Sequence, residues 1–167
     1  MIHEHVEGKD IKEELTRLLR EKYGEKVKYY SKNHPEGMVL PAFVVDVRLV
    51  RGKDETVNVV TKEFSCRIIY LQEDSSAEDA ELDQYTKAKE IRDLLKCKDK
   101  KRNPKGAMIV NVCDRYINVS EFGIDYIGRE GNILEASFIL RFLDFKENLY
   151  NDDELIDELK INEKLED

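Results

Sequence analysis

The sequence predicts an α+β domain: a mostly antiparallel, twisted sheet with two helices packed on one face and a short C-terminal helix. Three observations lead to this fold class. Residues 133–145 alternate so that one face of an extended chain is wholly apolar. Two other stretches have helical apolar spacing, and each is followed by strand-like segments. This order of helix, strands, helix and strands is typical of α+β proteins.

The alternating stretch Ile133–Phe145 is predicted to be the long strand on which the core is built. A second strand is expected at Phe122–Arg129, and Glu130-Gly131-Asn132 supplies turn residues between the two. We therefore expect an antiparallel hairpin at the centre of the sheet. Its core-facing side chains are predicted to be Leu134, Ala136, Phe138, Leu140 and Phe142.

The N-terminal part is expected to begin with a flexible segment, residues 1–9. A helix follows, with Asp10 as its N-cap and Gly24 as its terminator. Its apolar stripe is formed by Ile11, Leu15, Leu18 and Leu19. Lys26–Ser31 then predicts a short strand near a sheet edge.

Two further segments, Ala42–Val50 and Lys62–Leu71, alternate between apolar and polar residues. They are expected to pair as a hairpin. The polar residues Arg51–Thr61 between them predict a long connecting loop.

The second helix is predicted to open at Ser76, which has capping-box spacing with Asp79, and to run to about Lys96. Strands are expected next at Ala107–Cys113 and Tyr116–Val119. The helix residues predicted to face the sheet are Leu82, Tyr85, Ala88, Ile91 and Leu95.

Length and charge predict one domain and one acidic tail. The chain has 167 residues and a net charge of −8, of which residues 146–167 carry −6. We assign residues 10–145 to a single domain and 146–167 to an acidic tail with a short amphipathic helix. No apolar run is long enough to span a membrane, and MIHEHVEGKD lacks the features of a signal peptide, which predicts a cytoplasmic protein.

Catalytic, cofactor-binding and metal-binding residues are not predicted. Asp46 and Glu63 could suggest a metal-dependent nuclease, but Lys62 and Glu63 are adjacent and leave opposite faces of a strand. Asp46 is therefore expected to be solvated or ion-paired. The three cysteines form no CxxC pair and are expected to be free thiols. We predict a protein that is not an enzyme and needs no cofactor or metal.

Two charged segments are the candidate partner-binding sites. The loop Lys96–Lys105 has six basic residues and one acid, and it suits either DNA or an acidic protein face. The alternative is a solvated loop whose lysines complement the helix C-terminus. The tail segment Asp152–Leu165 has an apolar stripe at roughly helical spacing. The candidate residues are Lys98, Lys100, Lys101, Arg102 and Lys105 in the loop, and Leu155, Ile156 and Leu159 in the tail.

Several segments together resemble the phage tail terminator proteins of contractile tails and prophage-like elements of Gram-positive bacteria. The resemblance lies in Leu18–Tyr30 (LLREKYGEKVKYY), Leu40–Val45 (LPAFVV), Phe64–Tyr70 with the acidic helix through Leu95, and the closing strand Leu134–Phe145. It is a match of element order and scattered residues over most of residues 10–145.

The resemblance implies a structural virion protein, located in the tail or neck and assembled in the host cytoplasm. It implies a hexameric ring that caps the head-proximal end of the tail tube and the last sheath layer. The implied partners are further copies of the chain, the tail tube protein, the sheath protein and the head–tail connector or neck proteins. DNA would pass through the ring without sequence-specific binding. The alternative is a head–tail connector or tail-completion protein, and a third hypothesis is a small DNA-processing enzyme.

Overall fold

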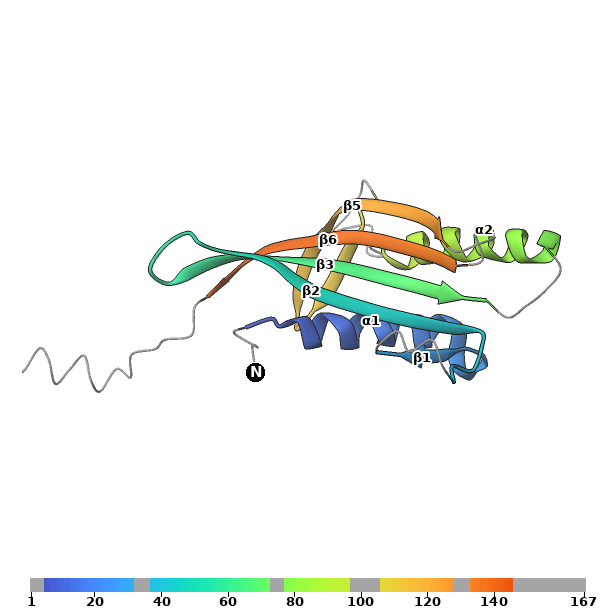
Figure 1. Cartoon of the computed structure of the whole chain (residues 1–167). Coiled ribbons are helices and arrows are strands. Elements are labelled where there is room, and N and C mark those ends of the chain that lie inside the picture. The colour runs from blue at the N-terminus through green and yellow to red at the C-terminus, as the bar shows by residue number, and fades with distance from the viewer. Residues whose placement is uncertain (1–4, 32–36, 73–76, 97–105, 128–132, 146–167) are drawn as a thin grey trace, which may run out of the picture.

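The computed structural model of the chain describes residues 5–31, 37–72, 77–96, 106–127 and 133–145 (Figure 1). They build an α+β fold with one six-stranded sheet in the order β1-β2-β3-β6-β5-β4. The strands are β1 (Lys28–Tyr30), β2 (Ala42–Asp54), β3 (Val59–Leu71), β4 (Ile109–Val112), β5 (Arg115–Ile127) and β6 (Ile133–Phe145). The helices are α1 (Gly8–Tyr23) and α2 (Ala77–Leu94), with a 3-10 turn at Gly24–Lys26.

Antiparallel pairing dominates the sheet, as predicted. The short strand β1 runs parallel to β2 at the edge, and the other neighbours are antiparallel. The hairpin of β5 and β6 is confirmed, with Ile127 opposite Ile133. Its expected turn, residues 130–132, lies outside the described residues, as does the predicted C-terminal helix.

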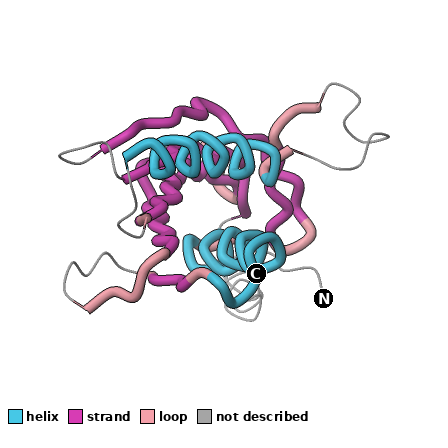
Figure 2. Tube along the Cα trace, turned by 90° about the vertical axis from the view of Figure 1, so that its right-hand side faces the viewer, coloured by secondary structure: helices cyan, strands magenta, loops and turns pink. Residues whose placement is uncertain are grey.

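The core lies on the face of the sheet that both helices cover. Apolar side chains of α1 and α2 join alternate residues of β2, β3 and β6 in one buried cluster, which confirms the predicted placement of the helices. Figure 2 shows that the sheet curls instead of lying flat. All five side chains predicted to form the apolar face of β6 contribute to this core, and Leu134, Ala136 and Leu140 are fully buried.

The N-cap of helix α1 lies three residues earlier than predicted. Its N-cap is Glu7, and Asp10 occupies position N3, so the prediction of Asp10 as N-cap is wrong. The Asp10 carboxylate accepts a hydrogen bond from the Glu7 backbone N–H at 2.8 Å, completing a reciprocal capping box. The helix ends before Gly24, whose positive φ of 62° suits glycine, as the sequence indicated.

Helix α2 faces the sheet differently from the prediction. Ile91 and Leu95 are buried as expected, but Leu82 and Tyr85 are 68% and 69% exposed. Gln84 is buried in the same part of the helix. Helix α2 ends at Leu94, two residues before the predicted end at Lys96. The residue predicted to cap its N-terminus, Ser76, lies outside the described residues.

One predicted loop is mostly strand, and two strands predicted to be separate are one. Residues 51–54 and 59–61 continue β2 and β3, so the hairpin closes tightly around residues 55–58 instead of through a long loop. The separate strands predicted at Tyr116–Val119 and Phe122–Arg129 are one strand, β5. An irregularity between Ser120 and Gly123 bends it, with Glu121 at a positive φ of 53°. A local bulge therefore replaces the predicted break.

Candidate functional site

The structure does not place the partner-binding residues predicted from the sequence. Lys98, Lys100, Lys101, Arg102 and Lys105 fall in residues 97–105, outside the described residues. Both ends of that basic loop are nevertheless fixed: Lys96 forms a bridge with Met108, and the Ile109 N–H donates to the Leu95 carbonyl at 2.8 Å. The loop is thus presented where α2 ends and β4 begins.

The tail residues Leu155, Ile156 and Leu159 also lie outside the described residues. Their attachment point is defined, because β6 runs to Phe145. The acidic tail therefore leaves the domain from the end of the strand that forms the middle of the core.

A projecting arm is the most prominent surface feature, and the sequence did not predict it. We define the arm as residues 49–63 of the β2–β3 hairpin together with residues 141–145 of β6. Figure 1 shows it extending beyond the helices. The arm exposes large apolar side chains, with Val57 at its tip 85% exposed. The others are Leu49, Val50, Leu143 and Phe145.

One edge of the arm is open to pairing. Among the described residues, β1 pairs with β2 only at Ala42–Val44, so residues 45–53 of β2 pair with β3 on one side alone. An open edge is a template for another strand. Exposed charges and a bulge disfavour non-specific pairing of this edge with strands of other molecules. The charges are those of Arg48, Arg51 and Lys53, and the bulge lies between Leu49 and Arg51.

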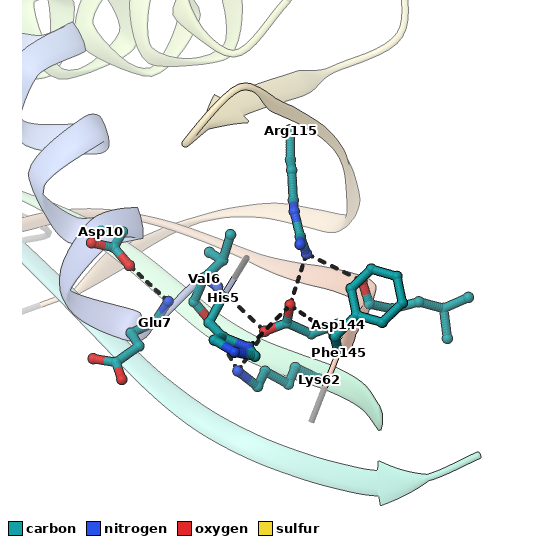
Figure 3. A network of polar contacts seen from close by, with 9 residues as sticks. His5, Val6, Glu7, Asp10, Lys62, Arg115, Asp144 and Phe145 are labelled. Atoms are coloured by element: carbon teal, nitrogen blue, oxygen red, sulfur yellow. Dashed lines mark hydrogen bonds and ion pairs between the residues drawn. The ribbon is translucent and has the colours of Figure 1, made fainter. Parts of the chain in front are cut away.

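A buried carboxylate holds the root of the arm (Figure 3). The Asp144 side chain is fully buried, and its oxygens lie 2.6 Å from Lys62 Nζ and 2.8 Å from Arg115 Nη1. The Val6 backbone N–H donates to the same carboxylate at 3.3 Å, and His5 Nδ1 lies 4.0 Å away. This Asp144 cluster joins β3, β5, β6 and the segment before α1.

The charges of the cluster stabilise its ionised form. Burial alone raises the pKa of Asp144, but hydrogen bonds from Lys62, the Val6 N–H and Arg115 outweigh it and lower the pKa below its usual value. Lys62 also donates to the Val6 carbonyl at 3.3 Å. The Asp144 carboxylate thus accepts hydrogen bonds from donors of the protein itself. The Asp144 cluster holds β3, β5 and β6 together at the root of the arm.

A hollow of about 560 Å³ lies on the helix-free face of the sheet. We call it the outer hollow. Asp46, which the sequence analysis expected to be solvated or ion-paired, lies there and is ion-paired: its carboxylate contacts Arg67 and lies 3.0 Å from Arg48 Nε. Arg67 also lies 3.8 Å from Glu135 on β6. The lining is completed by Ser31, Val44, Ile69, Leu71, Ile127 and Ile133.

Among the described residues, no three metal-ligating side chains gather into a site. Glu63, the other carboxylate weighed for a nuclease, is paired with Arg141 at 2.7 Å on the arm. Two surface features are available for contact with other molecules: the arm, with its apolar side chains and open strand edge, and the outer hollow, with its mixed charge.

The sequence also matches a known protein family. The sequence model of a family described as phage tail terminator protein matches residues 10–148. The chain belongs to the phage tail terminator family. A phage tail terminator is a structural protein of the virion tail that associates with other tail proteins. No curated protein matches this sequence. No helix of the described residues is long and apolar enough to cross a membrane.

Proposed function

We propose that this tail terminator acts as a hexameric ring on the head-proximal end of the tail tube. The ring ends tube growth, holds the last sheath layer in a contractile tail, and presents the surface on which the head connector docks. Its function is assembly without catalysis, and DNA passes through its lumen without sequence-specific contacts. Family membership supports the general role, and the ring and its contacts are our extension of it.

The arm is the observation that carries the proposal. It projects from one end of the sheet and exposes Leu49, Val50 and Val57, which nothing in the described residues of the same copy covers. A surface at one end of a subunit that fits a different surface of the next subunit makes a head-to-tail contact. Such contacts close into a ring when the rotation between neighbours is suitable. We infer that the arm reaches the neighbouring copy.

The remaining surfaces would then serve the other partners. The basic loop 97–105 supplies positive charge for acidic faces of a neighbour, the tube protein or the sheath protein. The net charge of the chain is −8, so the ring would repel DNA and would not retain it in the lumen.

Tails assembled without this protein test the proposal. With every other tail protein present, we expect tubes that exceed the normal length and carry no heads. A connector or tail-completion protein would instead leave tubes of normal length without heads. Tubes of normal length with heads attached would contradict both functions. Electron micrographs of the particles, with length distributions, give the readout, and the intact gene supplied in trans is the control.

A further inference from the structure

The helix-free face of the sheet has an apolar floor within the outer hollow that is only partly covered. Val44 and Ile69 are already buried in this floor, whereas Ile127 is 43% exposed and Leu71 and Ile133 are half-buried. Sheets normally bury apolar faces against another element, and both helices described here cover the opposite face. The hollow therefore has room and apolar surface for one more element.

The charged side chains of the outer hollow favour an acidic occupant. Asp46 and Glu135 are 24% and 15% exposed, and each contacts an arginine. Arg48 and Arg67 are more accessible, at 71% and 36%. The carboxylates are thus largely covered while the guanidinium groups still face solvent. Arginine presents five donors in a planar fork, so each can bind a further carboxylate.

The chain itself carries a segment with matching chemistry. Residues 146–167 contain nine acids and three lysines, and they include the apolar stripe Leu155, Ile156 and Leu159. A helix with this spacing presents the three apolar side chains on one side and carboxylates beside them. Such an amphipathic stretch is too short to be a stable helix in water alone and gains its order from packing.

The length of the tail fits the distance to the hollow. Phe145 is the last residue of β6 and lies on the same face of the strand as Ile133 and Glu135. Ile139 precedes Phe145 by six residues of strand, which span about 20 Å, and it lies level with Arg48 across the sheet, because Ser65 pairs with both. The six residues 146–151 span about the same distance when extended. The segment Asp152–Leu165 can therefore begin near Arg48, and as a helix it covers about 20 Å more, as far as Glu135 and Ile133.

We propose that the tail segment Asp152–Leu165 docks in the outer hollow of its own chain. Leu155, Ile156 and Leu159 face the apolar floor, and neighbouring carboxylates bind Arg48 and Arg67. The same chain is the occupant because its tether holds the segment at an effective concentration of roughly millimolar near the hollow. The contact lies within one copy and does not depend on the ring.

A spin label on the tail tests this contact in the full-length protein. Lys160→Cys places the label beside the stripe without removing an acid or an apolar residue. Cys97→Ser and Cys113→Ser confine labelling to that position, because Cys66 is fully buried. We expect the amide signals of Arg67, Ile133 and Glu135 to lose intensity in the ¹⁵N-labelled chain. Unchanged intensities at these residues would overturn the proposal.

A mixed sample separates the same chain from a second copy. Isotope-labelled chains without a spin label are combined with unlabelled chains that carry one. We expect no loss of intensity around the hollow in this mixture. Loss there as large as in the doubly labelled chain would identify a second copy as the occupant and would overturn docking within one chain.

Substitutions separate specific docking from general proximity. Leu155→Asp with Leu159→Asp is expected to restore the signals of the hollow residues, because the apolar contact is lost. Arg48→Glu should restore them in part. Arg92→Glu reverses the charge of another exposed arginine, on α2, and should leave the loss of intensity unchanged. Equal effects of Arg48→Glu and Arg92→Glu would contradict binding of the tail at Arg48.

Discussion

Lys62 and Asp144 lie on neighbouring strands, two residues out of register, with Nζ and a carboxylate oxygen 2.6 Å apart. Lys62 is directly opposite Phe142 and reaches diagonally to Asp144 across the core-facing side of β3 and β6. Arg115 approaches the same carboxylate from β5 at 2.8 Å. The root of the arm is thus held by charge where the apolar core ends.

Asp144→Asn is expected to reduce the free energy of unfolding by about 3 kcal/mol at pH 7, because removing one partner of a buried ion pair leaves the other uncompensated. The pKa of Asp144 is lower in the folded protein than in the unfolded chain. The ionised carboxylate therefore stabilises the wild type above about pH 4, and this stability is lost as the pH falls through the folded-state pKa. The difference between the two proteins should therefore shrink below about pH 4. Urea unfolding of both between pH 3 and 7 measures this, and a constant difference would contradict it.

Leu140→Asp is expected to prevent folding. Leu140 is fully buried in the centre of β6, and an unpaired carboxylate there costs several kcal/mol, comparable with the whole stability of a domain. Leu143→Asp is the matched control, since Leu143 lies on the same strand and is 63% exposed. Circular dichroism and thermal melts should show a folded control and an unfolded Leu140→Asp chain. Cooperative melting of Leu140→Asp would mean that β6 does not face the core as described.

The core of this fold could be predicted from the sequence because its signals are local. Alternation along 133–145 identifies which side chains of β6 are buried, and Gly24 marks the end of α1. The face of α2 was harder to predict. An apolar stripe predicts which side of a helix faces the sheet, but it does not show how much of the helix the sheet covers. Leu82 and Tyr85 lie on the predicted stripe and are nevertheless exposed.

The arm and the Asp144 cluster could not be predicted by this reasoning. Strands with solvent on both faces need no alternation, so the polar residues 51–61 were interpreted as a loop. The cluster joins Asp144 to Lys62, 82 residues away, and to Val6, 138 residues away. Periodicity describes neighbours along the chain and carries no information about such contacts. The family resemblance was recognisable because it depends on element order, which the structure retains.

Glu121 should tolerate glycine better than a β-branched residue. Its φ of 53° lies in the left-handed region, where a Cβ costs roughly 1–2 kcal/mol and branching at Cβ costs more. We expect Glu121→Gly to equal or exceed the wild type in stability and Glu121→Val to lose about 1–2 kcal/mol. Chemical denaturation of the three proteins measures the difference. Equal stability of the valine and glycine variants would show that the bulge in β5 is not strained.

The arm's apolar side chains are expected to matter for assembly and not for folding. Leu49→Glu with Val57→Glu alters residues that are 58% and 85% exposed, so the melting temperature should change little. Burying two apolar side chains at an interface contributes a few kcal/mol, which makes a loss of at least tenfold in assembly onto tails the expected result. Leu82→Glu, a comparably exposed site on α2, is the control. Equal assembly by the wild type, the double variant and the control would show that the arm is not part of the assembly interface.

The basic loop is expected to contribute a salt-sensitive contact. Replacing Lys98, Lys100, Lys101 and Arg102 with glutamine should leave the domain folded and lower the yield of head-joined particles in a complementation assay. Exposed charges are screened within roughly 10 Å at 0.1 M salt, so the wild type should approach the variant as salt increases during assembly in vitro. Normal particle yield from the variant would identify the loop as a solvated segment without a partner.

The symmetry of the head-proximal end of isolated tails tests the central claim most directly. A cryo-electron microscopy reconstruction of that end should contain one ring of six copies of this chain, with each arm in contact with the next copy. A single copy, a threefold or twelvefold ring, or absence of the chain from that end would contradict the account.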